Sequence, residues 1–346
     1  MNFVLIRFSS LGDVVLQTPF AALLKFLYPD AHISFLTSEP FKSLVENHPY
    51  IDEVRTIKRL KGVADRSQLK LLAREIDQKK NTVVFDLHGT LRAKLIRLYL
   101  KKTPCIQIPK RSVLRKILIW TKLDFLKSLP SHHERVIRDL SFLFPNDFTT
   151  KDIERFNQEK VINSQLTTLS QSFYKPKEKL LDKYIVISPV ASFINKRWPI
   201  KHVQEWIELF LEDEEFKEFH LVLLAGPADD YCQEICIQNE RWHNLQGKTN
   251  LGETIDWMSG ASLCVANDTG TTHIAEALGV TAISLFGPTS ESFGFRTHLE
   301  KSHTISVDLP CRPCSATGSK PCTQKSLLCM EGILPGDVMK YVKEAL

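Results

Sequence analysis

The sequence has no apolar run that approaches the roughly 18 residues needed for a membrane-spanning helix. Its first residues, Met1 to Arg7, also lack the charged, apolar and small-residue regions of a secretory signal peptide. These absences argue against an integral membrane or secreted protein. We therefore expect a cytoplasmic protein.

Glycine is scarce, with 14 in 346 residues, and neither half of the chain contains a G-x-G-x-x-G turn. This argues against an oxidoreductase that binds a dinucleotide through that turn. Low-complexity tracts and repeats of solenoid length are also absent. With 43% hydrophobic and 25% charged residues, the chain has an ordinary globular composition, and its length favours two domains.

Positive charge is concentrated in the first half. Residues 1–175 contain 29 Lys and Arg against 17 Asp and Glu, whereas residues 176–346 contain 16 against 23. Between Arg92 and Lys127, eleven basic residues and one acid, Asp124, alternate with Leu, Ile and Trp120. This pattern suits an anionic membrane surface or an anionic acceptor, although a solvated charged face would look the same. Nucleic acid is a weaker option, because no recognisable binding module accompanies the charge.

The most informative stretch runs from Ser262 to Phe286. It predicts a buried strand over 262–266, a turn, a short helix that ends at Gly279, and a second strand over 281–286. The turn contains Asp268, Thr269 and Gly270. Free backbone N–H groups at the start of a helix attract phosphate, so the turn is a candidate anion site. Ordinary helix capping is the alternative.

The chain opens with a similar unit. A strand over 3–8 leads through Ser10, Gly12 and Asp13 into a helix over 14–28, and a second strand follows over 32–37. Ligands of doubly wound sheets bind beyond the carboxyl ends of the strands, where Asp13 is predicted to lie. Asp13 is therefore either a helix-start residue or a general base.

Another strand end carries cationic residues. A strand over 82–87 precedes Arg92 and Lys94, which could hold an acceptor phosphate or carboxylate. A loop-rich stretch at and after the segment 51–57 could join the same basic surface through Arg55, Arg59, Lys61 and Arg66. A polar stretch over 173–183 is the predicted linker. Beyond it, a strand over 184–188 leads to Ser192 and to Lys196, which is placed to contact a diphosphate.

Four of the eight cysteines form a cluster with the spacing C-x2-C-x7-C-x6-C, namely Cys311, Cys314, Cys322 and Cys329. In a reducing compartment, such a cluster favours either a structural zinc site or free thiols over disulfides. Four thiolates leave no open coordination position, so a bound ion would brace the loop and would not take part in catalysis.

The chain resembles the ADP-heptose-using lipopolysaccharide heptosyltransferases over nearly its whole length. The matching pieces are Arg7-Phe8-Ser9-Ser10-Leu11-Gly12-Asp13-Val14, Asp86-Leu87-His88-Gly89-Thr90-Leu91-Arg92, Lys196-Arg197-Trp198-Pro199, Leu245-Gln246-Gly247-Lys248-Thr249-Asn250-Leu251, Asn267-Asp268-Thr269-Gly270 with His273, and Phe286-Gly287-Pro288-Thr289. Each piece alone is weak evidence, but together they are highly specific.

The resemblance implies a GT-B fold of the α/β class, with two Rossmann-like parallel-sheet domains that face each other across a cleft. The expected divisions are residues 1–175 for the acceptor side, 176–334 for the nucleotide sugar, and a last helix, 335–346, that can return to the first domain. It also implies an inverting transfer that needs no metal for catalysis, on the cytoplasmic face of the inner membrane, from ADP-heptose to an anionic lipid-linked core acceptor.

In that scheme Asp13 is the catalytic base. The residues expected to bind the donor are Ser192, Lys196, Asp268, Thr269, Gly270 and His273. Those expected to bind the acceptor are Ser10, Gly12, Arg92 and Lys94. The alternatives are a related transferase with another nucleotide sugar or acceptor, and a non-catalytic protein that has kept the fold.

Overall fold

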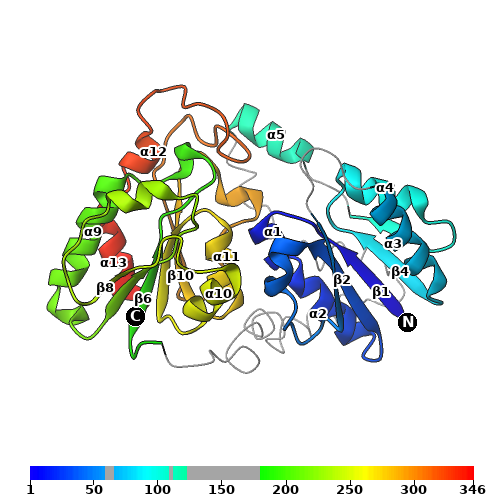
Figure 1. Ribbon diagram of the computed structural model, residues 1–346. Coiled ribbons are helices and arrows are strands. Elements are labelled where there is room, and N and C mark those ends of the chain that lie inside the picture. Colours follow the sequence, from blue (N-terminus) through cyan, green and yellow to red (C-terminus); the bar gives the residue numbers. More distant parts are fainter. Residues whose placement is uncertain (59–65, 109–111, 123–179) are drawn as a thin grey trace. The chain divides into compact units, whose positions relative to one another are not determined.

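The computed structural model describes residues 1–58, 66–108, 112–122 and 180–346, which form two compact α/β units (Figure 1). The described part of the first unit is residues 1–58 and 66–108, and that of the second is residues 112–122 and 180–346. The domain boundary predicted near residue 175 lies outside the described residues. None of the helices in the described ranges combines the length and the apolarity needed to cross a membrane.

The first unit is built on a five-stranded parallel sheet with the order β3-β2-β1-β4-β5. Its strands are β1 (Asn2–Ile6), β2 (His32–Ser38), β3 (Glu53–Ile57), β4 (Thr82–Asp86) and β5 (Cys105–Gln107). The connecting helices are α1 (Leu11–Val15), α2 (Thr18–Leu27), the 3₁₀ helix η1 (Glu39–Leu44), α3 (Arg66–Gln78) and α4 (Leu91–Tyr99). The central strand β1 is almost completely buried, because it pairs on both sides and its apolar residues enter the core.

The second unit contains a six-stranded sheet with the order β11-β10-β9-β6-β7-β8. Its strands are β6 (Tyr184–Ser188), β7 (His220–Leu223), β8 (Trp242–Asn244), β9 (Leu263–Asn267), β10 (Thr281–Phe286) and β11 (His303–Ser306). Numbered from its own first strand, this is the 3-2-1-4-5-6 order of a dinucleotide-binding sheet, in which ligands bind where the strand order reverses. That point lies between β6 and β9.

The second unit has helices on both faces of its sheet. Its helical segments are α5 (Ser112–Thr121), η4 (Ile194–Lys196), α9 (Ile200–Glu212), η5 (Glu214–Phe216), η6 (Asp230–Glu234), α10 (Leu251–Ser259), α11 (Gly270–Ala277), η7 (Glu291–Phe293), α12 (Leu328–Glu331) and α13 (Pro335–Ala345). In Figure 1, α13 lies beside α9, and its apolar side chains enter the same core as those of α9. The last helix thus packs on its own unit, whereas the sequence allows a return to the first domain.

Helix α5 also differs from the expectation, because residues 1–175 had been assigned to the first domain and α5 groups with the second unit. Leu118 of α5 packs on Phe293. The Arg115 guanidinium lies over the rings of Phe295 and Phe293, at 4.9 and 5.9 Å from their centroids. These contacts between residues about 180 positions apart hold α5 on the second unit.

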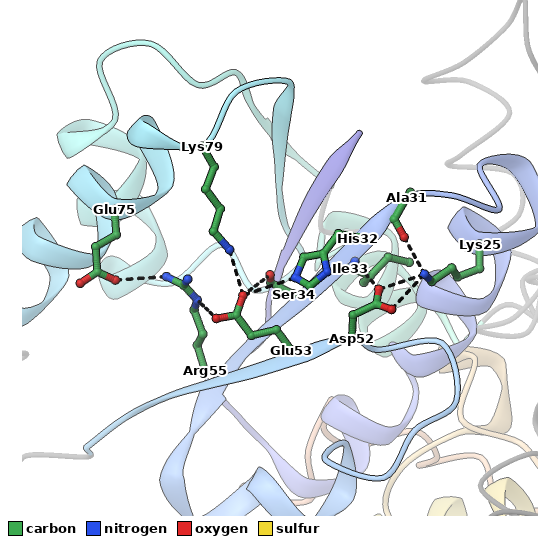
Figure 2. A network of polar contacts seen from close by, with 10 residues as sticks. All are labelled: Lys25, Ala31, His32, Ile33, Ser34, Asp52, Glu53, Arg55, Glu75 and Lys79. Carbon is green, nitrogen blue, oxygen red and sulfur yellow. Dashed lines mark hydrogen bonds and ion pairs between the residues drawn. The ribbon is translucent and has the colours of Figure 1, made fainter.

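A polar network joins the start of β2 to the start of β3 (Figure 2). The Glu53 carboxylate accepts hydrogen bonds from Ser34 Oγ at 2.9 Å, Arg55 Nε at 2.8 Å and Lys79 Nζ at 3.0 Å. Arg55 also donates to Glu75 at 3.1 Å. Arg55 is therefore a paired strand residue, which corrects the suggestion that it contributes to a basic acceptor surface.

This network predicts a loss of stability in acid. Burial favours the neutral form of Glu53, but the hydrogen bonds from Lys79, Arg55 and Ser34 outweigh it and lower its pKa to about 2. A lowered pKa stabilises the fold above the unfolded-state pKa of roughly 4.3, and this contribution is lost as the pH falls from there toward 2. We expect Glu53→Gln to have a smaller loss of melting temperature between pH 5 and pH 2 than wild type, as measured by circular dichroism. Parallel melting curves for the two proteins would contradict this assignment.

Candidate active site

The loops after β1 and β4 meet at the point where the strand order of the first sheet reverses. The two strands pair in parallel, with Ile6 opposite Asp86. The Leu87 N–H donates to Ile6 O at 3.2 Å, and Arg7 Nη1 donates to Leu87 O at 2.8 Å. The sequence thus brings the Asp13 turn and the turn before α4 to one edge, as parallel pairing of their strands requires.

Asp13 is held in this edge by three contacts, all to its Oδ2 atom. Arg7 Nη2 forms an ion pair with it at 2.7 Å, and Ser10 donates from Oγ at 2.7 Å and from its backbone N–H at 3.2 Å. The bond from the Ser10 N–H is one half of a capping box at the start of α1, and the Asp13 N–H donates to the Ser10 side chain in the other half. The Asp13 side chain is 29% exposed. Asp13 therefore begins the helix, as one interpretation predicted, and it also remains within reach of solvent.

The surroundings of Asp13 keep it ionised. Burial raises the pKa of the carboxyl, but the Arg7 charge and the hydrogen bonds from Ser10 outweigh burial and lower it below its usual value of 3.8. Such a carboxylate is a weak base toward a resting hydroxyl. It can accept the proton once the hydroxyl oxygen has begun to bond and has become acidic, and Oδ1 is the oxygen outside the three contacts.

The other predicted acceptor residues lie at the same edge of the first unit. Ser10 is exposed and Gly12 is buried in α1. Arg92 and Lys94 occupy the first turn of α4, where Lys94 is exposed and Arg92 is half-buried. Their role in acceptor binding stays a prediction.

His88 also belongs to this edge, although we assigned it no role from the sequence. Its Nδ1 atom accepts the Phe8 N–H at 3.2 Å and lies 3.4 Å from Thr90 Oγ1. The Asp86 carboxylate fixes the same turn by accepting the N–H groups of His88 and Gly89 at 3.0 and 2.6 Å. The available signal was its position directly after a buried strand.

In the second unit, Asn267 joins the loops that follow β6 and β9. It is the last residue of β9 and is completely buried. Its Oδ1 atom accepts the Trp198 N–H at 3.3 Å, and its Nδ2 atom donates to Val190 O at 3.4 Å and to Pro189 O. The Lys196 loop and the Asp268 turn are therefore held together where the strand order reverses.

Lys196 and Asp268 form an ion pair there, with Nζ and Oδ2 separated by 2.7 Å. Thr289 Oγ1 donates to the same Oδ2 atom at 2.5 Å. The Lys196 and Asp268 side chains are 14% and 8% exposed, so water screens the pair only partly. Thr289 is not among the residues predicted to bind the donor, although Gly287-Pro288-Thr289 is one of the motifs that carry the resemblance.

The start of α11 is the turn that the sequence predicts as a candidate anion site. Thr269 is the N-cap residue, yet its hydroxyl bonds to Thr271 Oγ1 at 2.7 Å and not to a backbone N–H of the helix. The first N–H groups of α11 thus have no side-chain cap within this turn, and the positive end of the helix dipole adds to them. Gly270 is the first helical residue and lets a ligand approach the backbone.

The remaining predicted donor residues differ in exposure. His273 lies one turn into α11, is 7% exposed, and packs its ring 5.9 Å from that of Phe295. Ser192 is exposed in the loop between β6 and η4. The roles of both residues in donor binding stay predictions.

The four clustered cysteines line one cavity of about 260 Å³ in the second unit. In the described ranges, no group of three or more His, Cys, Asp and Glu side chains is already arranged to hold a metal ion. Zinc binding by Cys311, Cys314, Cys322 and Cys329 therefore stays a prediction.

Comparisons with known proteins agree with this architecture. Residues 69–325 match the glycosyltransferase family 9 (heptosyltransferase). The chain is 25% identical to lipopolysaccharide heptosyltransferase 1 of Campylobacter coli, over 99% of this chain and 98% of that protein.

Two solved structures share the fold. A glycosyltransferase family 9 protein from Veillonella parvula has a TM-score of 0.72 at 19% identity, covering 99% of this chain and 96% of its own. The Escherichia coli ADP-heptose lps heptosyltransferase II has a TM-score of 0.68 at 17% identity, covering 100% and 98%. These neighbours confirm the GT-B fold class expected from the resemblance.

The family match spans most of the chain and includes the turns that carry Lys196, Asp268 and Thr289. This protein therefore belongs to glycosyltransferase family 9, the heptosyltransferase family.

Proposed function

We propose that this protein transfers heptose from ADP-heptose to an anionic lipopolysaccharide inner-core acceptor, with inversion at the anomeric carbon. The Campylobacter coli relative is named for lipopolysaccharide, and the Escherichia coli structure is named for ADP-heptose. The observation that carries the proposal is the ionised, partly exposed Asp13 at the edge of the first sheet.

In the reaction, the acceptor hydroxyl oxygen forms a bond to the anomeric carbon while the bond from that carbon to the ADP oxygen breaks. The hydroxyl proton passes to Asp13, and ADP leaves with the bonding electrons. A single displacement of this kind inverts the anomeric centre, whereas a covalent intermediate would retain it.

The second unit supplies the positive charge that the leaving diphosphate requires. Lys196 would exchange its ion pair with Asp268 for a phosphate oxygen, and the N–H groups of Thr269 and Gly270 would bind the same group. Asp268 and His273 would then orient the sugar. In this proposal catalysis needs no metal ion, because a lysine and a helix start carry out the charge stabilisation.

Helix α5 of the second unit is proposed to contact an anionic membrane surface from the cytoplasm. On α5, Trp120 is 85% exposed and Ile117 is 39% exposed, and Lys116, which directly precedes Ile117, is also exposed. An aromatic and an aliphatic side chain beside a cation suit the headgroup region of an anionic bilayer. Arg92 and Lys94 are proposed to bind anionic groups of the acceptor.

The direct test supplies purified protein with ADP-heptose and an inner-core acceptor in anionic vesicles. We expect release of ADP, a product whose anomeric configuration is opposite to that of the donor, and sedimentation of the protein with the vesicles. UDP-sugars and GDP-sugars serve as matched donors. Release of UDP or GDP without release of ADP would reject ADP-heptose as the donor. Binding of ADP without turnover of any donor would favour a non-catalytic protein.

A further inference from the structure

The four clustered cysteines line one cavity, which we call the thiol pocket. Cys311, Cys314 and Cys322 belong to the segment that follows β11, and Cys329 lies in α12. The pocket measures about 260 Å³. Cys236, by contrast, is an exposed free thiol of the same unit outside the pocket.

Neighbouring residues of the same segment complete the wall of the pocket. Cys322 lines it together with Gln324, Ser326 and Leu327. The Cys314 thiol donates a hydrogen bond to Cys311 O at 3.1 Å, and Arg312 stands between these two cysteines in the chain. Contacts of this kind hold the side chains that would bind a metal ion in place.

We propose that the thiol pocket binds one zinc-class divalent cation through Cys311, Cys314, Cys322 and Cys329. Four thiolates select a soft or borderline metal with tetrahedral geometry and leave no position for a substrate, so the ion is structural. The four sulfurs are not yet gathered to ligand spacing in the described structure. Binding therefore draws them inward, to roughly 2.3 Å from the ion.

The segment that would hold the ion also holds the Lys196 loop. Asn195 Nδ2 donates to Lys320 O at 2.6 Å. Gly318 has a positive φ of 81°, and a Cβ atom added there would lie 2.5 Å from Lys196 Cγ. The segment thus packs directly against the aliphatic part of Lys196, where only glycine fits.

The same segment contacts the loop after β10, which carries Thr289. The Cys314 N–H donates to Pro288 O at 2.9 Å. Arg312 donates from Nε to Gly287 O at 2.6 Å and from Nη2 to Thr289 O at 3.2 Å. An ion in the thiol pocket therefore braces both loops that meet at Asp268. The effect on nucleotide binding rests on the proposed function, whereas metal binding itself does not.

The test begins with the full chain purified without chelator, whose zinc content is measured by mass spectrometry. We expect about one zinc per chain, and after exchange with Co²⁺ the intense near-ultraviolet charge-transfer band and visible d–d bands of a tetrahedral thiolate site. Cys314→Ser and Cys322→Ser are expected to lose the metal, whereas Cys236→Ser keeps it. The Co²⁺ spectrum of wild type needs no variant, so poor folding of a variant does not obscure the result.

The proposal is overturned if wild type neither purifies with zinc nor gives the Co²⁺ thiolate bands. Equal metal content in wild type and in Cys314→Ser/Cys322→Ser would overturn it as well, as would a thiol titration showing these cysteines paired in disulfides.

The effect of the ion on the Lys196 and Thr289 loops is measured separately, through ADP affinity. Removing the ion with a chelator should weaken ADP binding about tenfold, measured by calorimetry. Unchanged ADP affinity after metal loss would reject the bracing but keep the site. A wild type that holds zinc but never binds ADP would count against the proposed function alone.

Discussion

Replacing Asp13 by asparagine is expected to lower turnover by about 10²- to 10⁴-fold, the usual contribution of a positioned general base. Asparagine keeps the shape and can still accept the Ser10 N–H, but it cannot take up the acceptor proton. Binding of ADP should stay within about twofold of wild type, because the proposed nucleotide residues belong to the second unit. Steady-state kinetics and calorimetry measure the two effects separately.

Asp52→Asn is the matched control for this substitution. Asp52 is 33% exposed and pairs with Lys25 at 2.9 Å, so it resembles Asp13 in exposure and in its ion pair. It lies at the amino ends of the strands, in the network of Figure 2. Similar losses of turnover in Asp13→Asn and Asp52→Asn would mean that Asp13 acts only through stability.

The ion pair between Arg7 and Asp13 also predicts how turnover depends on pH. Because the pKa of Asp13 is below 3.8, its protonation should slow turnover only in strongly acidic solution. Arg7→Met removes the charge that lowers this pKa, so the acid side of the profile of kcat against pH should move to higher pH. If the fall of kcat at low pH occurs at the same pH in Arg7→Met and in wild type, a group other than Asp13 controls it.

The strand positions were largely predictable because buried parallel strands read as short apolar runs. Residues 184–188 and 281–286 were predicted with the observed bounds. Helix α10 has its own local start signal, because Asn250 and Glu253 form a capping box there. The local sequence was therefore enough to predict a strand or helix wherever its own apolar residues and capping residues mark where it begins and ends.

Two predictions differ from the structure, the first because the local effect of Pro19 was not weighed and the second because distant residues decide the packing. The helix predicted over 14–28 is divided into α1 and α2, with Pro19 in the first turn of α2 and the Thr18 hydroxyl bonded to Val15 O at 2.9 Å. Proline cannot donate the N–H that a continuous helix needs at this position. The packing of α5 on Phe293 depends on a partner far along the chain, which no local pattern reveals.

The same limit applies to the site. The position of the site loops followed from the rule that ligands bind at the carboxyl ends of parallel strands. The ion pair between Lys196 and Asp268, and the Thr289 hydroxyl that joins it, depend on the order β11-β10-β9-β6 in the second sheet. That order becomes visible only in the folded chain.

Replacing Lys196 by methionine is expected to lower kcat/KM by about 10²- to 10³-fold, in the range found for loss of one charge-stabilising donor. Methionine keeps much of the aliphatic packing against Gly318 but removes the charge that the departing diphosphate needs. It also leaves the Asp268 carboxylate without its cation, so the site becomes more repulsive to ADP. We therefore expect a fall of about tenfold in ADP affinity as well.

Lys343→Met is the matched control, because Lys343 pairs with Asp213 at the same 2.7 Å in the same unit. This pair joins α13 to the residue that follows α9, so its loss should affect stability alone. An equal loss of kcat/KM in both variants would assign Lys196 to stability. The double variant Lys196→Met/Asp268→Asn separates two roles of the lysine. If its kcat/KM returns to the wild-type value, Lys196 acts mainly by neutralising the Asp268 carboxylate and not by contacting the diphosphate.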